Sequence, residues 1–575
     1  GTKLMKDILT KITEGHGTME DLSSLEEIAR IVKQTALCGL GKTAPNPVLT
    51  TMRYFRHEYE RHIRDLRCDA FVCKGLVGAP CQSACPVGTE PWRYIAHLAR
   101  GEYAEAYRAI RETNPFPSVC ARVCDHKCEE RCRLGTTENQ PIAIRALKRF
   151  VTDHVDGLIY KPARVTRSAK ETAKVAVVGS GPAGLTAAHC LSLDGYKVTV
   201  FEADHEPGGM LISGIPAYRL PRKVLRQEIA SLIDENVTVK CGAALGRDFT
   251  IDDLLAKGYK AVLLAVGAHK SRRLNIEGED CDGVYPSIEF LRAFNLHGKK
   301  LAKGRVGVIG GGNSAVDAAR TALRQEEVES VIIFYRRTRH EMPALTDEVD
   351  SALQEGIRLE TLVSPTRILS RNGRLSGIEC VRNELGALDS SGRRRPVPLR
   401  GTEFSVPLDT LIVAISEEPD IDYIPAMGIE LIEGGTLRVD PETLATSRPG
   451  VFAAGDVVTG PNTVVDAIAA GKKAAAMIAR WLRGEELRQP RAARLPAVYV
   501  KPSVLSEEER SEIRRVQTPA LPMESRRRGF SEVELCLSEK DAIRESRRCL
   551  RCDLEFTEPK ENQTASRVTA ATSTR

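Results

Sequence analysis

The chain contains 575 residues, of which 42% are hydrophobic and 28% charged, and its formal net charge is +6. This length predicts about three or four domains with large buried cores, and the composition is that of an ordinary globular protein. The small net charge gives no reason to expect nucleic acid or a membrane surface as a partner, and apolar runs such as 261–266 are far shorter than the roughly 20 residues of a spanning helix. We identify no signal peptide and expect a cytoplasmic protein without membrane insertion.

Residues 1–64 are expected to form a helical module. Apolar residues recur at helical spacing from Leu4, with Ile8 on the same face, and a second apolar stripe follows Thr18, which is placed to cap the second helix. The chain begins at Gly1 in the middle of an element, so we expect further sequence upstream of it.

A glycine-rich run, Leu37-Cys38-Gly39-Leu40-Gly41-Lys42-Thr43, follows these helices. Residues 10–59 resemble the C-terminal iron–sulfur region of the NADH-binding flavoprotein subunit of complex I and of NAD-linked hydrogenases and formate dehydrogenases. The resemblance implies that Cys38 is the fourth ligand of a [4Fe–4S] cluster whose other ligands lie upstream of this chain. Otherwise Cys38 is a small buried thiol.

Half of the 16 cysteines lie between residues 68 and 132, which favours metal over disulfides in a chain without secretion signals. Their irregular spacing favours iron–sulfur clusters over structural zinc, which usually shows paired C-x2-4-C motifs, although zinc sites and disulfides remain alternatives. The number of thiols matches two four-cysteine sites. The candidate ligands are Cys68, Cys73, Cys81, Cys85, Cys120, Cys124, Cys128 and Cys132.

A polar connector over residues 151–172 leads into the pattern strand, glycine turn, helix and strand over 174–202. The glycines permit a tight turn, close approach of the backbone to a pyrophosphate and helix–strand packing, and an acid at the end of the second strand can accept a hydrogen bond from a ribose hydroxyl. This order of elements predicts a dinucleotide site rather than an ordinary glycine-rich turn. The residues expected to bind are Gly179, Gly181, Pro182, Ala183, Gly184 and Glu202.

A buried strand over 261–267 is expected to leave this first nucleotide-binding unit, and a second fingerprint follows over 305–335. Its expected contacts are Gly310, Gly312, Asn313, Ser314 and Ala315. The second strand here ends not in an acid but in Arg336 and Arg337. Guanidinium groups suit a 2′-phosphate, so NADP(H) is favoured over NAD(H), with a solvated basic loop as the alternative.

The end of the chain contains two further features. Residues 451–456 predict a strand that delivers Asp456, and a helix follows. Near the C-terminus, Cys549 and Cys552 form a single CxxC, which is a redox pair, half of a metal site or two incidental thiols. From Thr557 onward the composition predicts a disordered tail.

Several of these stretches resemble the glutamate synthase small subunit, a group that includes dihydropyrimidine dehydrogenase and the large subunit of ferredoxin:NADP transhydrogenases. The matching segments are Cys81-Gln82-Ser83-Ala84-Cys85-Pro86, Asn114-Pro115-Phe116-Pro117, Gly208-Gly209-Met210-Leu211, the run from Gly214 to Pro221, and Met342-Pro343-Ala344. The resemblance implies that Gly209, Met210, Arg219, Gly455 and Asp456 lie along FAD.

The same resemblance implies how the cysteines divide between two clusters. One cluster would use Cys68, Cys73, Cys81 and Cys132, and the other Cys85, Cys124 and Cys128. The family often completes the second cluster with Gln or Glu near the place of Lys148, so we assign that position to Cys120. This chain also departs from the family at Ser416-Glu417, where Gly-Gln is common, which places local nucleotide contacts in doubt.

These observations predict an α/β protein with two Rossmann-like dinucleotide-binding domains, the NADP domain inserted in the FAD domain, preceded by α-helical iron–sulfur domains. The expected parts are 1–64, a complex I-like region; 65–160, a [4Fe–4S] domain; 173–290 and 421–485, the FAD domain; 291–420, the NAD(P)H domain; 486–555, a C-terminal extension; and 556–575, a tail.

The expected function is that of an FAD-dependent NAD(P)H oxidoreductase that relays electrons through two [4Fe–4S] clusters to a catalytic or electron-accepting partner subunit. A hydrogenase, formate dehydrogenase or bifurcating complex would supply that partner. No general base is expected, because the flavin itself accepts hydride. A disulfide reductase would need a CxxC inside a nucleotide domain, where the cysteines are isolated. The alternative is a non-catalytic scaffold that holds zinc.

Overall fold

The computed structural model describes residues 1–167, 172–389, 392–489, 495–503, 506, 508–509 and 513–559. Most of the tail predicted from Thr557 onward therefore lies outside the described residues. Within them, no helix combines the length and the apolar character needed to cross a bilayer.

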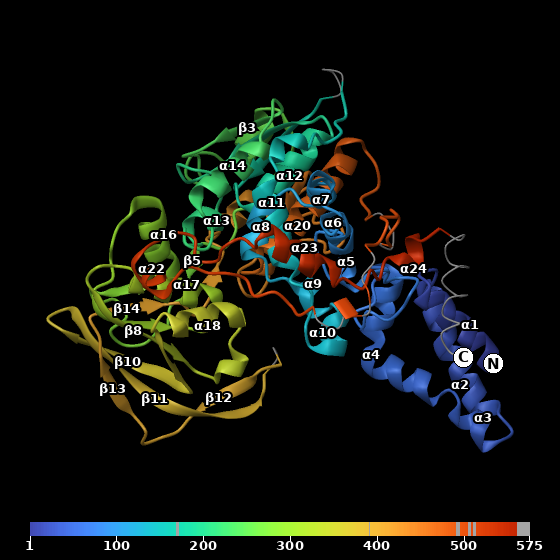
Figure 1. The fold of residues 1–575 in the computed structure, drawn as a ribbon, viewed down its shortest axis with the longest axis horizontal. Coiled ribbons are helices and arrows are strands. Elements are labelled where there is room, and N and C mark those ends of the chain that lie inside the picture. The colour runs from blue at the N-terminus through green and yellow to red at the C-terminus, as the bar shows by residue number, and fades with distance from the viewer. Residues whose placement is uncertain are drawn as a thin grey trace.

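The N-terminal module is helical, as expected, and forms the blue end of Figure 1. Its helices are α1 (Thr2–Thr13), α2 (Met19–Thr35), α3 (Gly39–Thr43) and α4 (Asn46–Arg64). Thr18 caps α2 through a reciprocal pair of hydrogen bonds with Asp21, which confirms the predicted cap. Leu4, expected on the apolar face with Ile8, is 51% exposed, and Met5 is buried there instead. The buried residues of α1 are Met5, Ile8 and Ile12, so Ile8 lies on the apolar face as expected and only Leu4 does not.

Short helices carry the cysteine-rich segment. They are α5 (Pro80–Ser83), α6 (Pro91–Leu98), α7 (Tyr103–Arg111), α8 (Pro117–Val123), α9 (Lys127–Glu130), α10 (Arg133–Glu138) and α11 (Ile144–His154). Prolines begin α5, α6 and α8, where the missing N–H costs no hydrogen bond. The interruptions between helices leave cysteines at helix ends and in loops, where thiols from several elements can converge.

A five-stranded parallel sheet in the order β16-β4-β1-β2-β3 forms the first nucleotide-binding unit. Its strands are β1 (Lys174–Val178), β2 (Lys197–Phe201), β3 (Val237–Lys240), β4 (Tyr259–Leu264) and β16 (Val451–Ala453). Its helices are α12 (Pro182–Leu193), α13 (Met210–Ser213), α14 (Arg222–Leu232), α15 (Ile251–Ala256), α19 (Asp456–Thr459) and α20 (Val464–Leu482). Because β16 comes from a segment far downstream, the chain leaves this sheet after β4 and returns to complete it.

The inserted segment builds a second parallel sheet in the order β6-β14-β7-β8-β9. Its strands are β6 (Val284–Pro286), β7 (Gly304–Ile309), β8 (Val328–Tyr335), β9 (Arg358–Thr361) and β14 (Thr410–Val413), and its helices are α16 (Ser287–His297), α17 (Asn313–Leu323) and α18 (Thr346–Gln354). The outgoing and returning connections, β5 (Lys270–Ser271) and β15 (Glu417–Glu418), pair with each other in antiparallel fashion. Two Rossmann-like sheets, one inserted in the other, confirm the predicted fold class.

The sequence analysis did not predict an antiparallel sheet, and it gave no helices or packing for the C-terminal extension. An antiparallel sheet of β10 (Val363–Arg371), β11 (Arg374–Leu388), β12 (Arg394–Pro398) and β13 (Phe404–Pro407) projects from the second unit (Figure 1). The C-terminal segment contains α22 (Met523–Arg528), α23 (Glu539–Arg547) and α24 (Leu554–Thr557), and α23 packs against α6 and α11. The end of the chain therefore returns to the cysteine-rich helices.

Candidate flavin, nicotinamide and iron–sulfur sites

A cavity of about 340 Å³ lies at the carboxyl edge of the first sheet. This volume lies at the lower end of the range typical of small-molecule sites, and a carboxyl edge is where open α/β sheets bind ligands. Nine of the residues predicted to bind FAD line the cavity. They are Gly179, Gly181, Pro182, Ala183, Glu202, Gly209, Met210, Gly455 and Asp456.

The glycines of the first turn have different physical roles. Gly179 has a φ of +102°, and a Cβ added there would lie 2.3 Å from the carbonyl oxygen of Ala265. A Cβ on Gly184 would lie 2.0 Å from the carbonyl oxygen of Gly179, so this glycine permits close packing of α12 on β1. A Cβ on Gly181 would meet no atom within 4 Å, because this position faces the open cavity. Backbone at Gly181 is therefore available to a pyrophosphate.

Two carboxylates border the same cavity. Glu202 is fixed by the backbone, since its side chain accepts hydrogen bonds from the N–H groups of Ser180 at 3.0 Å and Asp204 at 2.8 Å. Asp456 lies at the start of α19, and its Oδ1 atom is buried without a hydrogen-bond partner among the described residues. Burial raises the pKa of Asp456 to about 7. A buried polar atom of this kind fits a hydroxyl-bearing ligand such as FAD.

Arg219, which the family resemblance placed along FAD, does not line the cavity. Its guanidinium group is buried and forms ion pairs with Asp317 of α17 at 2.7 Å and Glu348 of α18 at 3.0 Å. Asp317 also accepts a hydrogen bond from the hydroxyl of Tyr218 at 3.3 Å. Arg219 therefore connects the first nucleotide-binding unit to the second.

The second fingerprint repeats the arrangement of the first at the edge of the second sheet. A Cβ on Gly310 would lie 2.0 Å from the carbonyl oxygen of Ala414, whereas one on Gly312 would meet nothing within 4 Å. Ala315 is fully buried and packs in the core of this unit. The side chain of Asn313 accepts a hydrogen bond from the N–H of Leu345 at 3.0 Å, so it fixes a loop. Space is therefore open beside Gly312 at the start of α17.

The two arginines after β8 differ in their surroundings. Arg337 is 3% exposed, pairs with Asp389 at 2.6 Å and donates to the carbonyl of Arg394 at 2.6 Å. Arg336 is exposed and forms no ion pair with any residue the structure describes. Partial desolvation beside β8 and the nearby charges of Arg337 and Arg393 lower the pKa of Arg336. Arg336 is the arginine available to a 2′-phosphate.

Four predicted ligands, Cys85, Cys120, Cys124 and Cys128, lie close enough to interact electrostatically with Lys148, and we call them the flavin-side cysteines. Cys120 is 1% exposed. Burial raises its pKa to about 11 and also raises the pKa values of Cys124 and Cys128. Without metal the thiols of Cys120, Cys124 and Cys128 are therefore neutral, and binding of metal would displace their protons. The buried Lys148, which the sequence could not place, offsets part of the negative charge of four thiolates.

This group is joined closely to the flavin half of the molecule. The backbone N–H groups of Ser118 and Val119 in α8 donate to Glu228 of α14 at 2.6 and 2.7 Å. The ammonium group of Lys472 in α20 donates to the carbonyl of Thr113 at 2.7 Å. The flavin-side cysteines therefore lie in the part of the helical domain that faces the first nucleotide-binding unit.

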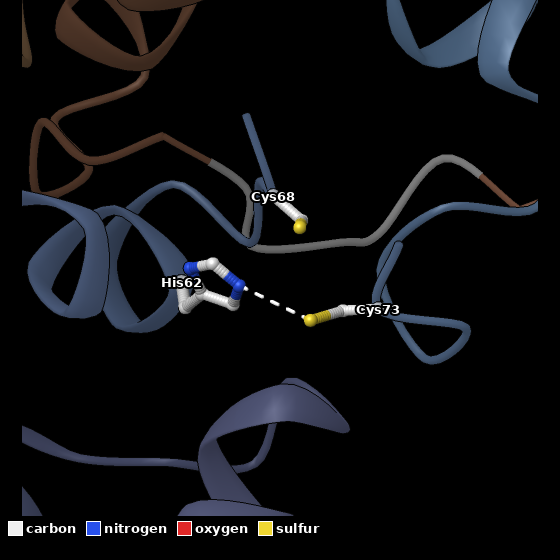
Figure 2. A group of neighbouring side chains, drawn as sticks. All are labelled: His62, Cys68 and Cys73. Carbon is white, nitrogen blue, oxygen red and sulfur yellow. Dashed lines mark hydrogen bonds between the residues drawn. The ribbon is translucent and has the colours of Figure 1, made fainter. Parts of the chain in front are cut away.

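The other four predicted ligands fall into two separate places. The ligand atoms of Cys68 and Cys73 lie within 4.8 Å of one another and of His62 (Figure 2). His62 Nε2 is 3.4 Å from the sulfur of Cys73, and its Nδ1 donates to the carbonyl of Glu58 at 2.7 Å, which directs Nε2 toward the thiols. One imidazole and two thiols form a donor set typical of zinc. The sequence prediction did not include His62.

Cys81 and Cys132 instead line a cavity together with Cys549 and Cys552 of the C-terminal CxxC, and we call these four the long-range cysteines. The family resemblance placed Cys68 and Cys73 in one cluster with Cys81 and Cys132, but neither Cys68 nor Cys73 lines this cavity. Cys38 is exposed at the start of α3, so the alternative of a small buried thiol is wrong.

Two parallel sheets with open glycine turns, a cavity with an unpaired buried acid and grouped thiols define a dinucleotide-binding flavoprotein with iron–sulfur regions. Family models agree with this class. Residues 173–471 match the pyridine nucleotide-disulphide oxidoreductase family, residues 53–157 match dihydropyrimidine dehydrogenase domain II with its 4Fe-4S cluster, and residues 1–62 match the NADH-ubiquinone oxidoreductase-F iron-sulfur binding region.

Similar proteins define the family more closely. The chain is 38% identical to the NADP(+)-dependent formate dehydrogenase subunit beta of Moorella thermoacetica and 36% identical to the NADPH-Fe(3+) oxidoreductase subunit beta of Geobacter sulfurreducens, in both cases over 96% of this chain and 87% of the relative. It is 36% identical to the glutamate synthase [NADPH] small chain of Escherichia coli over 72% of this chain and 91% of that one. FprA of Mycobacterium tuberculosis in complex with NADPH is a solved structure with 21% identity and a TM-score of 0.45 that covers 54% of this chain and 85% of its own.

The chain belongs to the glutamate synthase small-subunit-like family of NAD(P)H-dependent FAD and iron–sulfur oxidoreductases, and it carries a complex I-like N-terminal region. The resemblances stated from its sequence are confirmed. Membership of an enzyme family also removes the reason to prefer a non-catalytic scaffold.

Proposed function

We propose that this chain is the NADPH-linked subunit of a multi-subunit oxidoreductase in which electrons pass between NADP(H), FAD, two [4Fe–4S] clusters and a partner subunit. One observation carries the proposal. Leu211 and Val464 line the flavin cavity and also pack in the apolar cluster that contains Cys120, Cys85 and Cys124. Packed apolar side chains therefore connect the flavin cavity with three of the flavin-side thiols.

The described residues fit the tasks of binding and orientation. FAD, when bound, supplies the chemistry of accepting a hydride from a nicotinamide and releasing electrons one at a time. Gly181 leaves room for the pyrophosphate, Asp456 offers its unpaired oxygen to a hydroxyl, and Gly312 and Arg336 suit the phosphates of NADP(H). Hydride transfer depends on orientation more than on acid–base help, so we assign no general base.

The relatives support a partner subunit that contains the site at which electrons enter or leave the complex. Two of them are named as beta subunits, one of an NADP(+)-dependent formate dehydrogenase and one of an NADPH-Fe(3+) oxidoreductase. We therefore expect a partner subunit that oxidises formate or reduces ferric iron, with this chain connecting it to NADP(H). We also propose that the domains have the limits predicted from the sequence.

Anaerobic purification followed by iron, sulfide, zinc and FAD analysis tests the proposal. We expect bound FAD, iron with matching sulfide, bleaching of the flavin by NADPH, and a paramagnetic iron signal after reduction. Cys120→Ser should remove the iron of one cluster, whereas the matched control Cys241→Ser, at an exposed and isolated thiol, should not. Zinc without sulfide or FAD, or bleaching without an iron signal, would contradict the proposal.

A further inference from the structure

The long-range cysteines line one mostly apolar cavity. Cys81 and Cys132 come from the helical domain, and Cys549 and Cys552 come from the end of the chain. The remaining lining residues are mostly apolar and include Trp92, Ile95, Leu134, Ile142 and Ile144. Burial and the neighbouring thiols of Cys549, Cys552 and Cys132 raise the pKa of Cys81. The four thiols thus line one cavity, most of whose other lining residues are apolar.

The CxxC loop has a defined shape. Arg551, between the two cysteines, has a φ of +52°, which is a left-handed conformation that costs a non-glycine residue about 1–2 kcal/mol. Its buried guanidinium pairs with Asp553 at 2.8 Å and donates to the carbonyl of Val500 at 2.6 Å. Asp553 is fully buried. These contacts hold the loop in a conformation that the chain would otherwise avoid, as is common at ligand-binding loops.

The helix before the loop is held equally firmly against the cysteine-rich helices. Glu545 of α23 is fully buried and accepts a hydrogen bond from the backbone N–H of Ala143 at 2.9 Å. Arg548 pairs with Glu545 at 2.8 Å and donates to the carbonyl of Gln140 at 2.7 Å. The C-terminal segment is therefore part of the helical domain, and its cysteines are positioned toward Cys81 and Cys132.

We infer that Cys549 and Cys552 supply two of the four ligands of one [4Fe–4S] cluster, and that Cys81 and Cys132 supply the other two. This assignment rests on the proposed iron–sulfur function. It leaves Cys68 and Cys73 with His62 in a separate metal site.

The spacing of the sulfurs favours a cluster over a single ion. A zinc ion with bonds of about 2.3 Å holds its thiolates about 3.8 Å apart. Over the ranges that the structure describes, the one group of three or more ligand atoms that all lie within 4.8 Å of one another is that of His62, so no three sulfurs of the long-range cysteines are as close together as that. A four-iron cube holds its thiolates further apart than one ion does, and a CxxC pair is a common part of its ligand set.

Alkylation of the anaerobically purified full-length protein tests the assignment without any substitution. Iodoacetamide followed by mass spectrometry should leave Cys549 and Cys552 protected in the holoprotein and modify the exposed Cys241. After the clusters are removed by ferricyanide and a chelator, Cys549 and Cys552 should react together with Cys81 and Cys132. Modification of Cys549 and Cys552 in the iron-loaded protein at the rate of Cys241, or a disulfide between them, would overturn the assignment.

A second experiment uses the double variant Cys549→Ser/Cys552→Ser, with Cys536→Ser as the control from the same segment. The double variant should lose one cluster's iron and sulfide and the same paramagnetic signal that Cys81→Ser removes, while FAD content stays unchanged. Cys536→Ser should keep both. If the wild-type protein holds no iron, the proposed function fails and this assignment with it. If the wild type is loaded and the double variant keeps all of its iron, the assignment alone fails.

Discussion

Replacing Arg336 by Ala should weaken NADPH binding about tenfold and leave NADH binding nearly unchanged. Arg336 lies at the end of β8, is exposed and has no ion-pair partner among the described residues, so a 2′-phosphate would be its main charged contact. A hydrogen bond to a charged group contributes about 1.5–3 kcal/mol, and solvent exposure places this one at the lower end, which corresponds to about tenfold in Kd.

Arg337→Ala should behave differently, because Arg337 is already engaged. The substitution removes the ion pair with Asp389 and the hydrogen bond to the carbonyl of Arg394, which join β8 to the antiparallel sheet. Breaking a buried ion pair costs about 3 kcal/mol. We therefore expect lower thermal stability, with any loss of affinity similar for NADPH and NADH.

The assay is titration of flavin bleaching with each nucleotide, together with thermal unfolding of every variant. Arg371→Ala, at an exposed position at the end of β10, is the matched control for loss of one positive charge. Equal losses of NADPH and NADH affinity in Arg336→Ala would refute the assignment of the 2′-phosphate. So would a selective loss of NADPH affinity in Arg337→Ala without loss of stability.

Three further predictions concern the flavin site and its neighbouring cysteines. Gly181→Ala should preserve the apoprotein's thermal stability but reduce FAD per chain, and full FAD content in this variant would contradict the prediction. Gly184→Ala should instead lower stability by about 1–3 kcal/mol, because its Cβ would lie 2.0 Å from the carbonyl oxygen of Gly179. The pKa of Asp456 is raised from 3.8 to about 7, so the folded apoprotein retains a proton that the unfolded chain loses, and stability falls by at most about 4 kcal/mol as the pH rises from 4 to 7. Asp456→Asn should remove this fall in thermal unfolding midpoints, and an unchanged pH profile would argue against it. Lys148→Met should make the reduction potential of a cluster on the flavin-side cysteines more negative, because a buried cation stabilises the reduced state. A redox titration followed by electron paramagnetic resonance measures this potential. An unchanged potential would show that Lys148 does not have that role.

The parts of the fold that depend on local backbone requirements could be predicted from the sequence. The turn after β1 requires a positive φ at Gly179, and the same requirement recurs at Gly310, so the two nucleotide-binding units and their glycine turns could be predicted from the sequence. Thr18 was predictable as a cap for the same reason, because its hydrogen bonds are to residues three positions away.

Features that depend on contacts between distant parts of the chain could not be predicted from the sequence. Arg219 is in a segment that runs beside the flavin cavity, but its direction is decided by Asp317, which lies on an inserted domain. The antiparallel sheet from β10 to β13 was missed because most residues of β10 and β12 are not buried, which leaves little hydrophobic alternation to detect. The grouping of the cysteines depends on the return of α23 to α6, which no spacing within 68–132 encodes.

That return has a consequence for biosynthesis. Cys132 leaves the ribosome about 420 residues before Cys552 does, which at roughly 5–20 residues per second is a delay of about 20–80 s. Until then the nascent chain holds only half of the long-range thiols, so a cluster bound by all four could assemble only after Cys552 has been synthesised. A product shortened by premature termination before Cys549 would lack this centre, and metal loading would thereby distinguish finished chains from incomplete ones.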